Sequence, residues 1–290
     1  MKKNRLILVM NLKTGDIKWA ENFYPVMRIR EECKKSEIDF NFVLEKDFQN
    51  WFTSFFLSEK QSPAGHRECF WLRGVTDPLI FDLLESENCL FFNSRESTEL
   101  AGDKLKTIEK FSGTIIKTPE VFSLSETVDN YPVIFKPRYG KMGEGIHIIH
   151  NGDEFKNILE SVTQKGLDIK DFVIQECITD SLGKDIRILF CNGKITGALK
   201  RHNPENFLSN GCKGGKSFVY HPVKKLKKAA EFIIEKSGLF CGSMDFLYSG
   251  KEFYLCELNS FPGFEHSEKD TGKNFVSPWV REIKSFMDKN

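Results

Sequence analysis

Two carboxylates and an amide interrupt neighbouring apolar segments in the last third of the chain. Asp245 lies within one such segment, and Glu257 and Asn259 lie within the next. Glu257 and Asn259 are two residues apart, so on a strand they share one face. Two carboxylates held close together in a half-buried sheet repel each other, and each is costly to desolvate alone. A hard divalent cation removes that conflict, and oxygen ligands without histidine or thiolate favour magnesium.

The two carboxylates meet only in one register of the hairpin that joins the segments. We expect Asp245 and Glu257 to be directly opposite if the turn has an odd number of loop residues, for example Gly250 to Glu252. Their Cβ atoms would then be about 4.5–5.5 Å apart. The alternative is a solvent-facing sheet surface. That alternative predicts lysine or threonine partners, so the acid pair favours the metal site.

A lysine closes an apolar strand in the middle of the chain, and a glycine-rich loop follows it. Val133–Lys136 is the predicted strand, and three glycines, Gly140, Gly143 and Gly145, follow within a few residues. Glycines let backbone N–H groups turn toward an anion, and lysine supplies a compact positive charge, so the segment suits a polyphosphate. It is neither a P-loop nor a dinucleotide fingerprint. A flexible hairpin with an exposed lysine remains the alternative.

Two further segments carry polar residues whose role depends on their neighbours. The apolar run from Phe172 ends in Gln175 and Glu176. It could present its backbone to an adenine edge, or it could simply connect two lobes. Arg187 follows Asp185 by two residues, so both side chains face one side of a strand. The pair is either a surface ion pair of little energetic value or, beside a phosphate, part of a site.

The elements that must position these residues predict an α/β protein of several lobes. Strands alternate with helices up to about Asn93, which favours an open lobe with parallel pairing. We divide the chain into residues 1–96, 97–178 and 179–290. The third part holds predicted strands at 185–191, 194–200, 242–248 and 252–258, a helix between Pro222 and Gly238, and a closing helix from Ser277.

Composition narrows the class of protein. The chain has 290 residues, 40% hydrophobic and 29% charged, with a net charge of +1. No global positive field would collect phosphates, so we expect no nucleic-acid partner. No apolar run approaches the eighteen or so residues of a membrane span. The eight cysteines contain no Cys-x-x-Cys pair, and several lie in apolar runs. We therefore expect reduced thiols and a cytoplasmic protein.

Taken together and in this order, the segments resemble the ATP-grasp fold, and within it the RimK/LysX-type carboxylate–amine ligases. The resemblance runs from about Cys69 to Asn274, with a weaker match before that. It is most specific in Glu257-Leu258-Asn259-Ser260-Phe261-Pro262-Gly263-Phe264-Glu265, followed by Glu268-Lys269 and Thr271-Gly272. It implies a Rossmann-like N-terminal lobe, a small central lobe and a C-terminal lobe, with the nucleotide between the last two.

The resemblance also implies roles for individual residues. The nucleotide would be bound by residues of the central lobe, its glycine loop and the strands that follow: Lys104, Lys136, Gly140, Met142, Gly143, Gly145, Gln175, Glu176, Cys177, Ile178, Asp185 and Asn210. Asp245, Glu257 and Asn259 would bind magnesium, as two ions that manganese could replace. Arg187 and Arg201 would face the transferred phosphate and the acyl group. Family members often carry arginine where this chain has Leu208, with Arg201 or Lys213 as candidate substitutes.

The implied activity is ATP-dependent formation of an amide or peptide bond through an acylphosphate, with release of ADP and phosphate. The acceptor would be a peptide, a protein C-terminus or a small acid, and the donor an amino acid such as glutamate. We expect a homo-oligomer. Two other classes stay open: a noncatalytic ATP-binding protein on the same fold, and a phosphotransferase that stops at phosphorylation.

Overall fold

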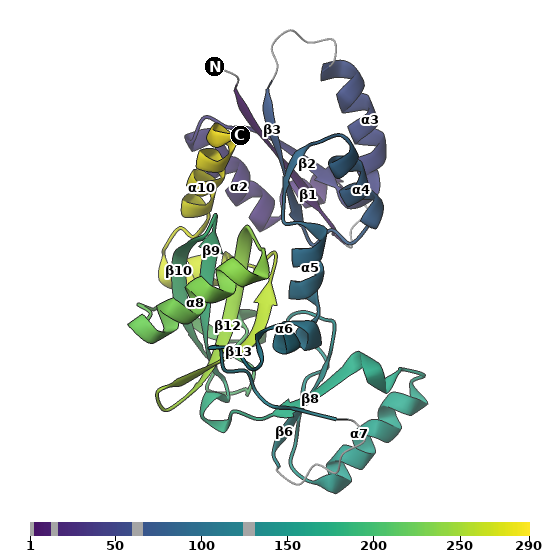
Figure 1. Ribbon diagram of the computed structural model, residues 1–290, viewed down its shortest axis with the longest axis vertical. Coiled ribbons are helices and arrows are strands. Elements are labelled where there is room, and N and C mark those ends of the chain that lie inside the picture. The colour runs from purple at the N-terminus through teal and green to yellow at the C-terminus, as the bar shows by residue number, and fades with distance from the viewer. Residues whose placement is uncertain (1–2, 13–16, 60–65, 124–130) are drawn as a thin grey trace.

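Three sheets follow one another along the chain, each with its own helices (Figure 1). The computed structural model describes residues 3–12, 17–59, 66–123 and 131–290. The mixed α/β architecture confirms the predicted fold class. The division of the chain at residues 96 and 178 stays a prediction.

The first sheet is parallel throughout, as predicted. Its strands run in the order β2-β1-β3-β4. They are β1 (Asn4–Met10), β2 (Asp39–Leu44), β3 (Arg67–Arg73) and β4 (Leu90–Phe92). The connecting helices are α1 (Ile17–Glu21), α2 (Tyr24–Lys35), α3 (Phe48–Glu59) and α4 (Pro78–Ser86). The sequence analysis did not predict α3, because its run of aromatic residues suits a strand as well as a helix.

Successive side chains of β1 enter two different cores, since a strand alternates its faces. Leu6 and Leu8 pack with α2 and with the last helix, α10 (Val276–Lys289). Ile7 and Val9 pack with α3 and α4 on the other face. The C-terminal helix therefore completes the core of the N-terminal sheet.

The second sheet is small and antiparallel, in the order β5-β8-β6-β7. Helices α5 (Arg95–Gly102) and α6 (Lys104–Phe111) lead into it. Its strands are β5 (Val121–Phe122), β6 (Val133–Pro137), β7 (His147–Ile149) and β8 (Phe172–Glu176), and α7 (Gly152–Gln164) covers it. The glycine loop joins β6 to β7, so it leaves the end of the strand that carries Lys136.

The third sheet is antiparallel, in the order β11-β10-β9-β12-β13. The strands are β9 (Lys184–Cys191), β10 (Lys194–His202), β11 (Lys216–Val219), β12 (Cys241–Ser249) and β13 (Glu252–Asn259). Helix α8 (Lys224–Ser237) packs on one face, and α9 (Glu265–Thr271) lies beside β11. Neither β11 nor α9 was predicted from the sequence, because β11 has only four residues and α9 has no apolar residue.

The other face of the third sheet changes character along its strands. On β9, Asp185 and Arg187 are followed on the same face by Leu189 and Cys191. The two apolar side chains join the core that α10 shares with the first sheet. The two charged side chains lie at the opposite end, toward the second sheet. One face of the third sheet therefore packs against α10 and the first sheet at one end. At the other end it carries the charged surface that includes Asp185 and Arg187, called the charged floor below.

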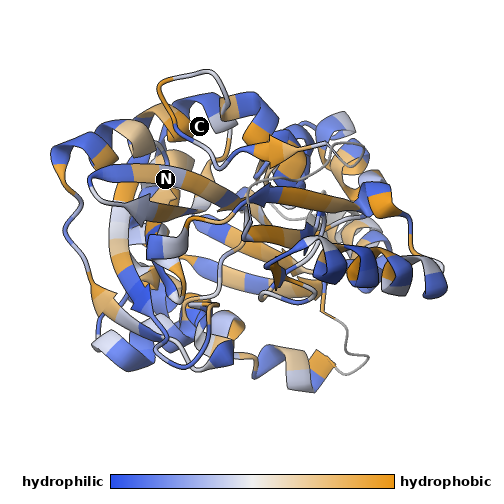
Figure 2. Ribbon diagram, turned by 90° about the horizontal axis from the view of Figure 1, so that it is seen from below, coloured by the Kyte–Doolittle hydropathy of each residue, from blue (hydrophilic) through white to orange (hydrophobic). Residues whose placement is uncertain are grey.

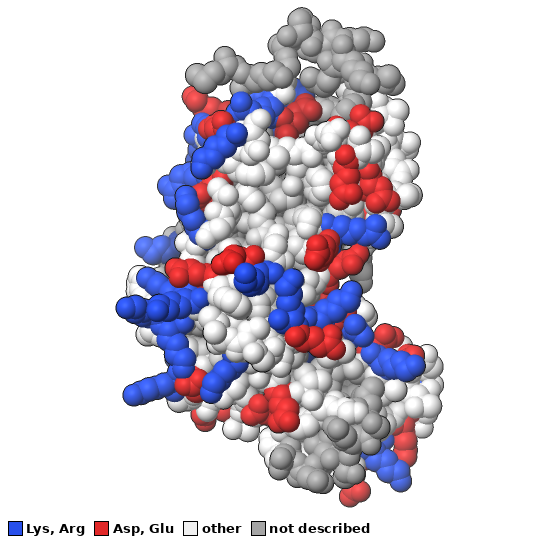
Figure 3. Space-filling model, in the orientation of Figure 1, with Lys and Arg blue, Asp and Glu red and all other residues white. Residues whose placement is uncertain are grey.

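Colouring by hydropathy places the most hydrophobic segments in the strands between the helices (Figure 2). On the face drawn in Figure 3, basic and acidic side chains are mixed, and lysines are dense over α8. All eight cysteines are free thiols, as predicted. Within the described part of the chain, no helix has the length and apolar character needed to cross a membrane.

Candidate functional site

Four charged side chains form one network on the floor of the third sheet. Their positions follow from strand register, because Asp185 lies opposite Arg201 and Asp245 lies opposite Arg187. Arg187 donates from Nε and Nη2 to the two carboxylate oxygens of Asp245, at 2.8 and 2.7 Å. Arg201 donates from Nε to Asp185 at 2.7 Å and from Nη2 to Asp245 at 2.8 Å. Asp245 is thus shared by two arginines.

This geometry corrects one of the sequence interpretations. Arg187 and Asp185 are not paired with each other, although they share a face. Each instead bonds across the sheet to a residue on a neighbouring strand, because cross-strand neighbours are closer than residues two apart on one strand. Asp185 also accepts a hydrogen bond from Ser209 Oγ at 2.5 Å. Sequence reasoning gave Ser209 no such role, since a lone serine in a loop carries no signal for it.

Burial and ion pairing shift the pKa values of this network in opposite directions. Burial raises the pKa of the Asp245 carboxyl, but Arg187 and Arg201 outweigh burial and hold that pKa well below its usual range. Burial lowers the pKa of Arg201, and the charges of Asp185 and Asp245 more than reverse that effect. Both partners therefore stay ionised, and removing one would leave a buried charge without compensation.

Asp245 and Glu257 are directly opposite each other, as the metal prediction requires. The prediction that this register needs a turn with an odd number of residues is wrong. The turn has two residues, Gly250 and Lys251, and the register shifts by one at a β-bulge, because Phe246 pairs with Leu255 while Asp245 pairs with Glu257. Cys256 is the extra residue, and both it and Glu257 line the same cavity.

The donor set tests whether magnesium fits here. Glu257 and Asn259 are partly exposed on the same face, and Asn259 Nδ2 donates to Glu257 Oε1 at 3.0 Å. These are the carboxylate and amide oxygens that magnesium prefers. Among the described residues, no three His, Cys, Asp or Glu side chains are grouped as a metal centre. Glu257 and Asn259 therefore fit the ion, whereas Asp245 already bonds two arginines and could join only by sharing its oxygens.

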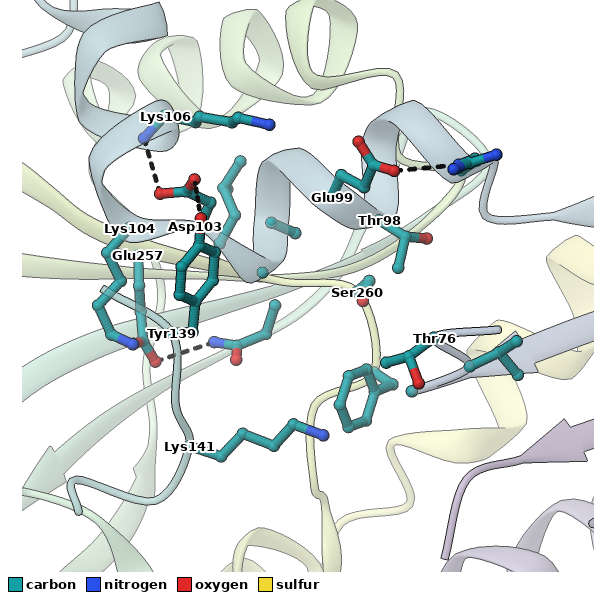
Figure 4. A pocket seen from close by; sticks show the side chains of 18 of the residues that line it. Thr76, Thr98, Glu99, Asp103, Lys104, Lys106, Tyr139, Lys141, Glu257 and Ser260 are labelled. Carbon is teal, nitrogen blue, oxygen red and sulfur yellow. Dashed lines mark hydrogen bonds and ion pairs between the residues drawn. The ribbon is translucent and has the colours of Figure 1, made fainter. Parts of the chain in front are cut away.

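Two lysines face this floor from the opposite side. Lys136 on β6 is 2% exposed, and Lys104 at the start of α6 is 8% exposed. Burial lowers the pKa of Lys104, while the nearby Glu257 carboxylate opposes that shift. Lys104 Nζ donates to the Gly140 carbonyl at 3.0 Å, so it bonds directly to the glycine loop. Figure 4 shows its tip beside the carboxylate of Glu257.

A second contact fixes the glycine loop to α6. Asp103 caps that helix by accepting from the backbone N–H groups of Leu105 and Lys106, at 3.0 and 3.1 Å. It also accepts two hydrogen bonds from Arg138, at 2.8 and 2.7 Å. The cap and the ion pair together hold Lys104 next to the loop. Neither Asp103 nor its partner Arg138 was predicted from the sequence as a site residue.

The glycine loop lies against the segment that contains Leu208 and Asn210. Gly140, Gly143 and Gly145 all have positive φ, and so does Met142. A Cβ added at Gly143 would lie 2.9 Å from Leu208 Cδ1 and 3.3 Å from Asn210 Oδ1. Leu208, at the position where the resemblance predicts an arginine, therefore makes a close apolar contact with the loop.

The predicted adenine segment lies on the strand next to Lys136. Gln175 is 1% exposed, and its Oε1 accepts no hydrogen bond from any described residue. Glu176 accepts a hydrogen bond from the backbone of Glu120 at 3.3 Å. Cys177 and Ile178 are buried where the chain passes toward the third sheet. A buried acceptor without a partner is unusual and indicates a place where a ligand donor could bond.

Two cavities meet at Lys104, Gly140, Lys141 and Glu257. The smaller, of about 110 Å³, brings together most of the predicted phosphate-side residues, namely Lys104, Gly140, Met142, Gly143, Asp185, Arg201, Asn210, Asp245 and Glu257. The larger, of about 500 Å³, includes Asn259. Lys136, Gly145, Gln175, Glu176, Cys177, Ile178 and Arg187 line neither cavity.

Comparison with known proteins gives a consistent result. A family model described as a RimK-like ATP-grasp domain matches residues 100–283. A probable alpha-L-glutamate ligase from Psychromonas ingrahamii is 31% identical over 213 residues, which cover 69% of this chain and 68% of that protein. One from a Picosynechococcus species is 28% identical over 208 residues, covering 68% and 67%.

Solved structures share the fold at low sequence identity. D-alanine–D-alanine ligase from Bacillus anthracis, complexed with ATP, has a TM-score of 0.67 and 15% identity over 99% of both chains. The ATP-grasp ligase PsnB, complexed with a phosphomimetic variant of its minimal precursor, Mg and ADP, has a TM-score of 0.69 and 12% identity over 98% of both chains.

Proposed function

Because the chain belongs to the RimK-like ATP-grasp family, we propose that it is an ATP-dependent ligase that joins a carboxylate to an amine. The observation that carries this proposal is the charged floor, where Arg187, Arg201, Asp185 and Asp245 form one network beside Glu257. Lys104 faces it from across the smaller cavity. Such a site can neutralise and position a triphosphate without a covalent nucleophile.

The nucleotide would lie between the second and third sheets. Lys104 and Lys136 would contact its phosphates, and the N–H groups of Gly140, Met142, Gly143 and Gly145 would cover them. Gln175, Glu176, Cys177 and Ile178 would border the adenine. The Oε1 of Gln175, which has no hydrogen-bond partner among the described residues, supports that assignment. Asp185 and Asn210 line the cavity between these groups.

Magnesium would be held by Glu257 and Asn259, with Asp245 sharing an oxygen if a second ion binds. Bound there, the ion would offset negative charge on the phosphate oxygens. Glu257 would thus act on the nucleotide through the ion, from the side of the charged floor and opposite Lys104. Asn259 would keep the carboxylate of Glu257 oriented through the 3.0 Å hydrogen bond already present.

The proposed reaction has two steps. A carboxylate oxygen of the first substrate attacks the γ-phosphorus, and the bond to the bridging oxygen breaks, so that ADP leaves and an acylphosphate forms. The amine nitrogen of the second substrate then attacks the acyl carbon, phosphate leaves with the bonding pair, and the nitrogen loses its proton. The names of the relatives favour glutamate as the substrate that supplies the amine.

Arginines are suited to the charge that develops on the transferred group. Arg187 keeps 11% of its side chain exposed, and we assign it to the phosphoryl oxygens. Arg201 is more deeply buried and bonds both Asp185 and Asp245, so we assign it chiefly to holding that floor in place. Arg201 and Leu208 both line the smaller cavity, and Leu208 stands where the resemblance predicts an arginine.

The proposal is tested by measuring ADP release across pairs of acids and amines, with product mass by mass spectrometry. We expect release to require both substrates and to yield an amide. ADP release with an acid alone, giving a stable acylphosphate or phosphorylated product, would indicate a phosphotransferase instead. Nucleotide binding without turnover for any pair would favour a noncatalytic ATP-binding protein.

A further inference from the structure

The larger cavity adjoins the proposed phosphate site and has a different lining. Its walls come from the loop after β3, from α5, from the glycine loop and from the segment after Glu257. At about 500 Å³ it lies within the range of about 300–1,000 Å³ that is usual for small-molecule sites. It opens onto the smaller cavity at Lys104 and Glu257, so a molecule bound in it could present one end to the γ-phosphate.

The end that meets the phosphate site is charged. Lys104 lies beside Glu257 there (Figure 4). Lys141 Nζ lies 4.0 Å from the centroid of the Phe261 ring. A lysine stacked on an aromatic ring is a cation whose side chain is already held in place. This end of the cavity suits a carboxylate.

The other end is apolar. Val75 is 2% exposed and Phe81 is 3% exposed, and Pro78 and Ala101 complete that part of the wall. Of the charged side chains that line the cavity, Arg95 donates to Glu99 at 3.1 Å and Asp103 accepts from Arg138 at 2.8 Å, so neither is free to pair with a ligand. A second charged group on the ligand would therefore lose its hydration here without gaining a partner, which is unfavourable. This end suits hydrocarbon.

One polar atom is present in the cavity wall without a hydrogen bond. Thr98 Oγ1 is buried, and it has no hydrogen-bond partner within the described ranges of the chain. Figure 4 shows Thr98 on α5 and Ser260 on the segment that follows β13. Buried hydroxyls are usually paired, so an unpaired one in a cavity wall indicates a polar atom on the ligand.

We propose that the acyl substrate is a carboxylic acid with an apolar body, bound with its carboxylate toward Lys104 and Lys141. Its hydrocarbon lies against Val75, Phe81 and Ala101, and a polar atom reaches Thr98. This inference rests on the proposed ligase function and deepens it. An acid such as glutarate, with a second carboxylate in place of the hydrocarbon, is disfavoured. Either a free small acid or the C-terminal residue of a peptide could supply this chemistry.

The inference is tested by calorimetry on the full chain with ADP and magnesium present. The probes are 4-phenylbutanoate, 4-(4-hydroxyphenyl)butanoate, glutarate and a tripeptide ending in phenylalanine. We expect the aryl acids or the tripeptide to bind at least about tenfold more tightly than glutarate. Tighter binding of the tripeptide would identify a peptide C-terminus, and tighter binding of the aryl acids a small molecule. Glutarate binding as well as the best apolar probe would overturn the inference.

Two variants distinguish loss of acid binding in the cavity from a general effect on the fold. Ala101→Leu adds volume to the cavity wall and should weaken the best apolar probe at least about tenfold while leaving ADP binding unchanged. The matched control is Ala229→Leu, a similarly sized change on α8, which should change neither. Thr98→Val should remove any preference for the hydroxylated aryl acid over 4-phenylbutanoate. Unchanged probe binding in both cavity variants would overturn the inference.

Measuring nucleotide binding distinguishes failure of the cavity assignment from failure of the ligase proposal. If ADP binds and no apolar acid does, the assignment of the cavity is wrong and the ligase proposal stands. If neither ADP nor ATP binds the native chain in the presence of magnesium, the ligase proposal fails and this inference fails with it.

Discussion

The two carboxylates that face each other at the site, Asp245 and Glu257, differ in what they contribute to stability and activity. Asp245 is buried and bonds two arginines, whereas Glu257 is partly exposed and bonds only Asn259 among the contacts described above. Substituting the first disturbs the buried network of the sheet, whereas substituting the second leaves that network intact. Activity and stability should therefore separate between these two carboxylates.

Glu257→Gln should reduce ATP turnover by at least about a hundredfold, as for loss of a principal electrostatic group. The amide keeps the shape and the partial exposure, so the unfolding midpoint should stay near that of the native protein. Glu252→Gln is the matched control, because Glu252 lies on the same strand and pairs with Lys117 and Lys225 at the surface. Near-native turnover of Glu257→Gln in excess magnesium would remove Glu257 from the site.

Asp245→Asn should lower the free energy of unfolding as well as turnover. The change leaves Arg187 and Arg201 facing a neutral amide in a buried setting, and breaking a buried pair costs about 3–5 kcal/mol. Denaturant unfolding of this variant beside Glu257→Gln measures the difference. Equal stability of the two variants would show that the arginines do not depend on Asp245.

Arg187→Lys should reduce kcat with little change in ATP affinity. Lysine keeps the charge but cannot make both hydrogen bonds to Asp245, nor a planar contact with a phosphoryl group. Calorimetry of ATP binding, beside the steady-state rate for the best substrate pair, separates the two effects. A parallel loss of affinity and rate would place Arg187 in nucleotide binding alone.

The sequence predicts which residues form the candidate site, but it does not predict which side chains they pair with. The segment from Glu257 to Glu265 and the lysine before the glycine loop carry residue types at fixed spacing. The pairing of Arg187 with Asp245, and of Arg138 with Asp103, depends on which strands and loops lie side by side. Spacing along one strand does not contain that information, so the sequence suggested Asp185 instead.

At the scale of elements, two departures from regular structure shape the site. The bulge at Cys256 places that residue and Glu257 on the cavity side while Leu255 and Leu258 remain in the core. The glycine loop rests on Leu208 through Gly143. The bulge was not predictable from alternation, because an apolar cysteine before a glutamate reads as one more step of a regular strand.

Gly143→Ala should weaken ATP binding by displacing the glycine loop from Leu208. The added Cβ would lie 2.9 Å from Leu208 Cδ1, and overpacking of this kind costs about 1–3 kcal/mol, or about five- to 150-fold in affinity. Gly113→Ala is the matched control, since Gly113 also has positive φ, but apart from its chain neighbours no described residue has an atom within 4 Å of the added Cβ. Equal ATP affinity in the two variants would show that the contact with Leu208 has no role.

The glycine loop should also respond to ligand. Its backbone has few apolar anchors, so local opening should cost little in the absence of nucleotide. Hydrogen exchange measured over residues 140–145 should slow when ATP and magnesium are added. Equal protection with and without nucleotide would rule out closure of this loop over the phosphates.

At the scale of the whole molecule, the first sheet positions the wall of the larger cavity. Asn93, at the end of β4, donates to the carbonyls of Cys241 and Ser260 and accepts from the N–H groups of Phe240 and Cys241. Arg73 donates to the carbonyl of Pro262 at 3.0 Å. The loop after Asn259 is therefore held by residues more than 150 positions away in the chain. The sequence predicted both lobes but not this connection between them.

Asn93→Ala should destabilise the protein by at least about 2 kcal/mol, because several buried backbone groups lose their partner. It should also lower turnover, since Ser260 and Phe261 line the cavity. Urea unfolding and ADP release are the two measurements. Asn22→Ala removes an exposed amide that donates to the Lys18 carbonyl at 2.8 Å and should be neutral in both. A neutral Asn93→Ala would mean that the first sheet does not support the site.

The central claim is that ATP activates a carboxylate by transferring its γ-phosphoryl group to it. The direct test uses the acid that best supports ADP release, labelled with ¹⁸O in its carboxylate, together with its amine partner and unlabelled ATP. Transfer through an acylphosphate predicts that one labelled oxygen appears in each phosphate released, alongside ADP and the amide. Phosphate that contains no label, or release of AMP and pyrophosphate, would contradict the proposed mechanism.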